Sequence, residues 1–144
     1  GTVLELGEPA TTVLELADGA ASVITTTATK ITEGDVDDFE FFSLDAASRA
    51  STPYYVRATV TNDGPAGLGG LGAPFVAHDD SDMIVAPNVI NGEFEPCEGG
   101  TLPEKFLAGD TAELCMVFLV PEGRELVSID VQSETPAMAV RWTP

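Results

Sequence analysis

Cys97 and Cys115, the two cysteines of this chain, have the most definite chemistry in the sequence. Cys97 lies in a Pro/Gly-rich loop and Cys115 lies inside an alternating apolar run, so we predict a structural disulfide that joins a loop to a strand. A redox pair would need CxxC spacing. A zinc site would need more ligands than these two thiols and the distant His78. Because disulfides persist in oxidising compartments, the sequence predicts an exported protein.

His78 is the single histidine of the chain, and we expect it in an exposed, acidic loop. A copper electron-transfer site needs two histidines beside a cysteine such as Cys115, so the residue count excludes it. A Ser–His–Asp triad needs one histidine, but no GxSxG motif accompanies this one. The 24 acidic residues could supply a carboxylate pair for glycoside hydrolysis, but one Trp and two Tyr offer few aromatic faces for a sugar. We therefore expect that the chain has no catalytic residue and that the protein is not an enzyme.

Two groups of carboxylates invite a metal-site hypothesis. The denser one, Asp79, Asp80 and Asp82, resembles the oxygen-rich loops that bind calcium. The glycine and distal glutamate of an EF-hand are absent at the required spacing, so we favour a solvated acidic turn and no cofactor. The second group lies among phenylalanines that we expect to cover one end of the core: Asp35, Asp37, Asp38 and Glu40.

The charge balance excludes several classes of partner. With 24 acidic and 6 basic residues, the formal net charge is −18. Nucleic acid and anionic lipid surfaces both need clustered Lys and Arg, so neither is expected to bind. The charge favours solubility through mutual repulsion, and the alternatives are a cationic ligand, a divalent metal or life in high salt.

Length and hydropathy predict one globular domain, residues 1–144. The chain is long enough to bury a core, and its apolar fraction of 44% is typical of a globular protein. No apolar run approaches the ~20 residues of a membrane helix. No signal peptide is visible either. We expect that an export segment, of the secreted or lipid-anchor type, was removed ahead of Gly1.

The first third of the chain predicts small strands and one helical turn. Two similar segments, residues 2–10 and 12–20, each combine strand-like residues with a terminal turn. Residues 22–31 are rich in β-branched side chains, which favour a strand. Asp35 is a candidate cap for one or two helical turns at Val36–Leu44.

Residues 53–64 form the clearest alternating strand. Tyr54, Val56, Ala58 and Val60 share the face expected in the core, and Tyr55, Arg57, Thr59 and Thr61 share the wetter face. Residues 62–65 are expected to break this strand. The glycine-rich residues that follow predict an edge strand or a long loop.

The last half predicts further strands separated by turns. Residues 75–77 and 83–90 are candidates, and residues 111–120 form an apolar run typical of a sandwich interior. In residues 125–131, Val127, Ile129 and Val131 face one way, while Ser128, Asp130 and Gln132 face the other. Met138, Val140 and Trp142 alternate in the same manner. We therefore predict an all-β antiparallel β-sandwich with one short helical turn.

Motifs along most of the chain carry a family resemblance. They are Leu6-Gly-Glu8, Pro53-Tyr-Tyr-Val-Arg-Ala-Thr-Val-Thr-Asn-Asp-Gly64, Glu95-Pro-Cys97, Leu102-Pro-Glu-Lys-Phe106, Ala108-Gly-Asp110, Cys115-Met-Val-Phe-Leu-Val-Pro121 and Val140-Arg-Trp142. The chain resembles secreted or lipid-anchored actinobacterial proteins with a bacterial immunoglobulin-like domain of unknown function, and is similar to the mycobacterial immunoprotective extracellular antigen family. The resemblance implies an Ig-like sandwich outside the membrane, with Cys97–Cys115 as the family-type bridge. It supplies no catalytic residue.

These observations predict a non-enzymatic extracellular or cell-surface module that binds a protein, a peptide or an envelope component. The expected contact surfaces are the loops at residues 64–74, 79–82 and 91–100. The alternatives are a structural envelope or spacer domain without a dedicated ligand and, from a different class, a calcium-dependent binder or a carboxylate-based hydrolase.

Overall fold

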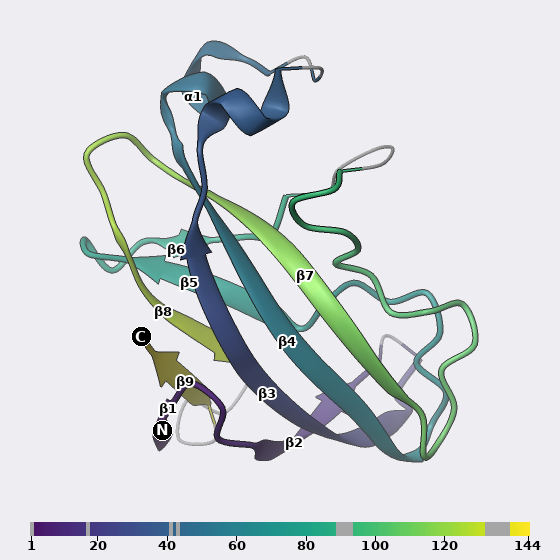
Figure 1. Cartoon of the computed structure of the whole chain (residues 1–144). Coiled ribbons are helices and arrows are strands. Elements are labelled where there is room, and N and C mark those ends of the chain that lie inside the picture. Colours follow the sequence, from purple (N-terminus) through teal and green to yellow (C-terminus); the bar gives the residue numbers. More distant parts are fainter. Residues whose placement is uncertain (1, 17, 41, 43, 89–93, 132–138) are drawn as a thin grey trace.

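The computed structural model of the chain describes residues 2–16, 18–40, 42, 44–88, 94–131 and 139–144. Within these residues, two sheets pack face to face as a β-sandwich (Figure 1). One sheet has the strand order β1 (Thr2–Glu5), β9 (Val140–Thr143), β8 (Leu126–Val131), β5 (Phe75–Asp79) and β6 (Ile84–Val85). The other has the order β2 (Ala10–Glu15), β3 (Ala21–Glu33), β4 (Thr52–Pro65) and β7 (Thr111–Val120). The predicted all-β sandwich is confirmed.

The two ends of the chain lie side by side in one sheet. β1 pairs with β9 in parallel, whereas the other described strand pairs are antiparallel. The two predicted N-terminal strands therefore separate, since β1 and β2 belong to different sheets. Gly7, which lies between them, has a φ of +94°, a conformation that glycine adopts without strain. The indole Nε1 of Trp142 donates to the Glu8 carbonyl (2.8 Å), which ties this connection to β9.

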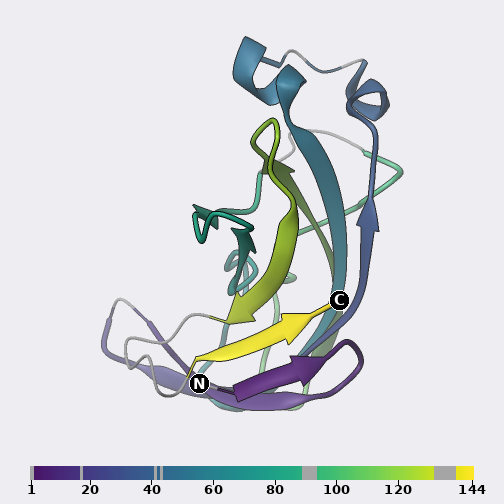
Figure 2. The same cartoon turned by 90° about the vertical axis from the view of Figure 1, so that its left-hand side faces the viewer.

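Two short helices cap one end of the sandwich. Figure 2 shows them beyond the ends of β3 and β4, with the two sheets seen as separate layers. The predicted turn is the 3₁₀-helix η1 (Val36–Phe39), where the Asp35 side chain accepts the Asp37 amide and Asp38 completes a capping box. A second helix, α1 (Ala46–Ala50), is capped by Asp45, and the Ser48 amide lowers the pKa of that carboxyl. No described helix is long and apolar enough to cross a membrane.

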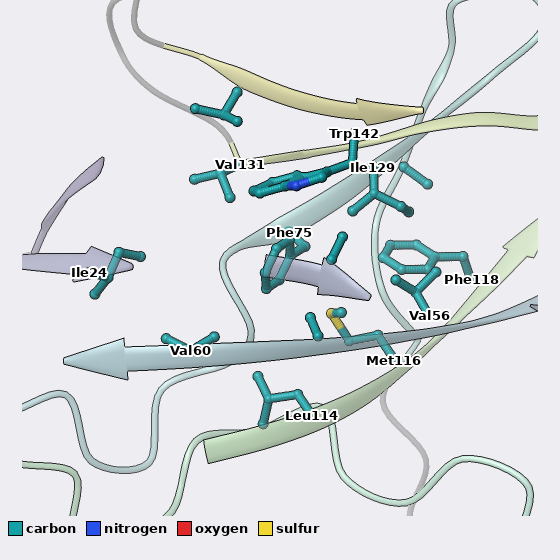
Figure 3. Packing of buried hydrophobic residues seen from close by; sticks show 14 of the residues in the cluster. Ile24, Val56, Val60, Phe75, Leu114, Met116, Phe118, Ile129, Val131 and Trp142 are labelled. Carbon is teal, nitrogen blue, oxygen red and sulfur yellow. The ribbon is translucent and has the colours of Figure 1, made fainter. Parts of the chain in front are cut away.

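The main core lies between the two sheets (Figure 3). Trp142 and Phe75 are buried at its centre, with ring centroids 6.0 Å apart. Val56 and Val60 of β4 reach it from the opposite sheet, as the alternation predicted. Each such side chain contributes about 1.5–3 kcal/mol through its removal from water.

A second apolar cluster covers the outer face of the four-stranded sheet. It contains Phe39, Tyr55, Phe94, Cys97, Cys115 and Val117. Tyr55 was expected on the wetter face, and this expectation is wrong because the rings of Phe39 and Phe94 bury it. Its hydroxyl donates to Asp38 (2.6 Å), and burial is the first cause that raises its pKa.

β7 is the edge strand of its sheet, although its apolar run is typical of a sandwich interior. Its run is continuously apolar because the main core covers one face and the second cluster covers the other. β4 also differs from expectation, because it continues through the predicted break to Pro65. Asn62 is tolerated there since its amide donates to the carbonyls of Ala66 and Phe106, while its oxygen accepts the Ser22 hydroxyl.

Some expectations concern positions outside the described residues: Phe41, residues 89–93, Gln132 and Met138. Of the strand predicted at residues 83–90, the described part contains β6 and a bridge from Asn88 to Val117.

Candidate functional site

A pocket of about 640 Å³ lies against β7, beside the disulfide. We call it the disulfide pocket, and it is lined by residues 72–73, 87–88, 94–95, 97–101 and 115–117. In Figure 1 the green segment that precedes β7 runs along the outer side of that strand. Its volume falls in the range of pockets that hold small molecules or a few side chains.

The disulfide holds one wall of the pocket on β7. Cys97 and Cys115 are bonded, as predicted, and both are nearly fully buried. The Cys115 amide donates to the Gly99 carbonyl (3.1 Å), and the Ala73 amide donates to the Gly100 carbonyl (2.9 Å). Parts of two predicted contact loops, residues 64–74 and 91–100, therefore meet at one site. The third loop, residues 79–82, does not line it.

The opposite wall contacts the same strand two residues further along. The Asn88 amide donates to the Val117 carbonyl (2.7 Å). Together with the hydrogen bond from the Cys115 amide to Gly99, this bond occupies two successive outward-facing backbone groups on the free edge of β7. Covering an edge strand in this way limits pairing with foreign strands. The pocket is therefore suited to side chains rather than to a whole added strand.

The lining combines apolar walls with acidic groups. Met116, which is buried, and Pro87 contribute apolar surface to the lining. Phe94 is the one aromatic residue of the lining, and its ring stacks on Phe39 with centroids 4.5 Å apart. The charged residues of the lining are Glu95 and Glu98, and both are exposed.

His78 occupies a different surface from the one predicted. It lies on β5 rather than in a loop, and its side chain is 13% exposed. Its Nδ1 is 3.2 Å from Oδ2 of Asp130 but lacks the alignment of a hydrogen bond. Asp130 also accepts two bonds from Arg141 Nε and one from Nη2 (2.9–3.1 Å), which raise the pKa of that guanidinium.

This cluster differs from a catalytic triad in the order of its contacts. The Ser128 hydroxyl donates a hydrogen bond to Asp130 (2.9 Å), so the acceptor of that bond is the carboxylate rather than the imidazole of His78. A triad instead requires the histidine between serine and aspartate. Alternation in residues 125–131 correctly separated Ser128 and Asp130 from Ile129. It misplaced Val127, which a register shift at His78 and Asp79 leaves 40% exposed.

The calcium candidates do not converge on a common point. Asp79 is buried, and its Oδ1 accepts the Ser81 amide (2.9 Å), the Ser81 hydroxyl (2.7 Å) and the Met83 amide (3.0 Å). Asp80 and Asp82 are exposed. Among the residues that the structure describes, no group of three or more His, Cys, Asp or Glu could hold a metal ion.

Neither the comparison with protein-family models nor that with curated proteins gave a match. Among solved structures, the chain is similar to MPT63, described as a secreted protein from Mycobacterium tuberculosis, with a TM-score of 0.60. The likeness covers 99% of this chain and 96% of that chain at 13% sequence identity. The predicted resemblance to a mycobacterial extracellular protein is thus confirmed at the level of the fold.

Proposed function

We propose that this chain is a non-enzymatic extracellular or cell-surface module that binds a segment of another polypeptide in the disulfide pocket. The observation that carries the proposal is that Gly99 and Asn88 are hydrogen-bonded to β7, that Ala73 is bonded in turn to Gly100, and that these segments line one pocket. A preformed cavity lowers the entropy lost on binding, because its walls are already ordered.

The extracellular location rests on two observations. The single pair of cysteines forms a buried disulfide, which is typical of proteins in oxidising compartments. The structurally similar protein is described as secreted.

A polypeptide fits this site better than an envelope glycan. Sugar sites commonly present an open aromatic face, but the ring of Phe94 is buried and already stacked on Phe39. The pocket instead presents the apolar side chains of Ala73, Pro87 and Met116. Apolar walls of this kind are suited to the aliphatic parts of a peptide's side chains.

A titration with short peptides tests this function. Capped tripeptides, Ac-Gly-Xaa-Gly-NH2 with basic, neutral, apolar and acidic central residues, would be added to the ¹⁵N-labelled protein. We expect amide shifts at residues 99–101 and 115–117, with dissociation constants on the order of 1 mM for the best peptide.

Gly100→Leu is the variant that should abolish these shifts. A Cβ at Gly100 would meet Met116 Cγ at 3.5 Å and the Cys115 carbonyl at 3.6 Å, which are ordinary van der Waals contacts with two residues of the pocket lining. Gly67→Leu is the matched control, since its Cβ would meet Leu107 at 3.5 Å and it lies outside the lining. Absence of binding by every peptide, or equal binding by Gly100→Leu, would contradict the proposal and favour a structural spacer domain.

A further inference from the structure

We infer that the disulfide pocket selects a basic side chain, arginine or lysine, on its partner polypeptide; this inference rests on the function proposed above. It names the chemistry of the ligand at that site.

The first support is the uncompensated charge of the lining. Glu95 and Glu98 carry the lining's formal charges, and both are exposed to solvent at the pocket. All six basic residues of the chain lie in its described parts, and none of them lines the pocket. The ion pairs among the described residues involve Asp130, not these two glutamates. A cation on the ligand would therefore be the first to pair with them.

The second support is the apolar surface beside these carboxylates. Ala73, Pro87 and Met116 line the same pocket. Lysine and arginine carry a long aliphatic stem below the charged group, and such stems pack on apolar surface while the charge stays near water. Apolar walls with carboxylates at an exposed position match both parts of a basic side chain. A neutral apolar side chain would match the apolar walls alone, and an acidic side chain would match neither the walls nor the carboxylates.

The third support is the charge of the whole chain. At a net charge of −18, the surrounding potential attracts cationic segments and repels anionic ones. This field acts on any cation and does not choose a position. The glutamates of the pocket supply the local preference, and the experiment must separate the two effects.

The experiment compares Ac-Gly-Arg-Gly-NH2 with the same peptide carrying citrulline, which has nearly the shape of arginine but no charge. The double variant Glu95→Gln/Glu98→Gln would be titrated beside Glu122→Gln/Glu125→Gln. The control pair has the same spacing, is exposed and lies outside the lining, so both variants change the net charge equally.

We expect the arginine peptide to bind about three- to tenfold more tightly than the citrulline peptide, because two exposed charge pairs contribute modestly. Glu95→Gln/Glu98→Gln should remove this preference, and the control variant should retain it. Equal affinity of the two peptides, or equal losses in both variants, would overturn the inference. If the citrulline peptide still shifts residues 99–101 and Gly100→Leu prevents it, the proposed function stands without the charge preference. Absence of all binding would remove both.

Discussion

Asp79 shows how the fold uses a carboxylate that looked available for a metal. Three donors from Ser81 and Met83 reach its Oδ1, and the bond from the Ser81 hydroxyl is the first cause that lowers its pKa. A carboxylate held in this way closes the turn after β5 rather than facing a ligand. The spacing of the aspartates identified an acidic turn, but it did not show that β5 extends to Asp79, which lies on the same buried face as Phe75 and Ala77.

Asp79→Asn should lower the melting temperature at neutral pH, because the ionised oxygen accepts these bonds more strongly than an amide oxygen does. A lowered pKa in the folded state stabilises the protein above the unfolded pKa of about 3.9, and that stability is lost as the pH falls through the folded pKa. The difference in melting temperature between the two proteins should therefore be full near neutral pH and disappear in strong acid. Asp80→Asn, in the same turn but exposed, is the control. A difference that does not change with pH would contradict this role.

At the scale of elements, the disulfide loop determines whether the pocket exists. Residues 94–101 are attached to β7 by the Cys97–Cys115 bond and by the amide of Cys115. The bridge spans 18 residues, and a cross-link of this length stabilises by roughly 3 kcal/mol through restriction of the unfolded chain.

Cys97→Ala/Cys115→Ala should therefore lower the free energy of unfolding by about 3 kcal/mol in urea titrations. The Cys115 amide should also exchange with solvent faster, since its partner Gly99 is no longer held in place. Reduced wild-type protein keeps both sulfur atoms, so it separates loss of the cross-link from loss of buried volume. Unchanged stability and exchange in both proteins would show that the loop is held by other contacts.

Three different sequence patterns predicted the long strands. The β-branched composition located β3, alternation located β4 and a continuous apolar run located β7, each to within a few residues. These patterns failed where a strand is buried on both faces or a polar residue is fully bonded. The apolar run in β7 could belong to a central strand or to an edge strand covered on both faces, and Asn62 could lie in a turn or in a strand. The outcome depends on loops and side chains from elsewhere in the chain.

At the scale of the whole molecule, the sandwich places its first and last strands side by side in one sheet and places the pocket on the edge strand of the other. The sequence predicted the fold class, the disulfide and the loops that provide part of the pocket wall. It could not predict that residues 72–73 and 94–101 meet, because that contact depends on β7 lying at an edge. It also missed the polar cluster around Asp130, whose members come from three strands.

The central claim is that the disulfide pocket binds a polypeptide side chain, and a crystal structure with Ac-Gly-Arg-Gly-NH2 tests it most directly. We predict peptide density between Gly100 and Val117, with the guanidinium within hydrogen-bonding distance of Glu95 or Glu98. An empty pocket at saturating peptide, or a peptide bound only at another surface, would contradict the account.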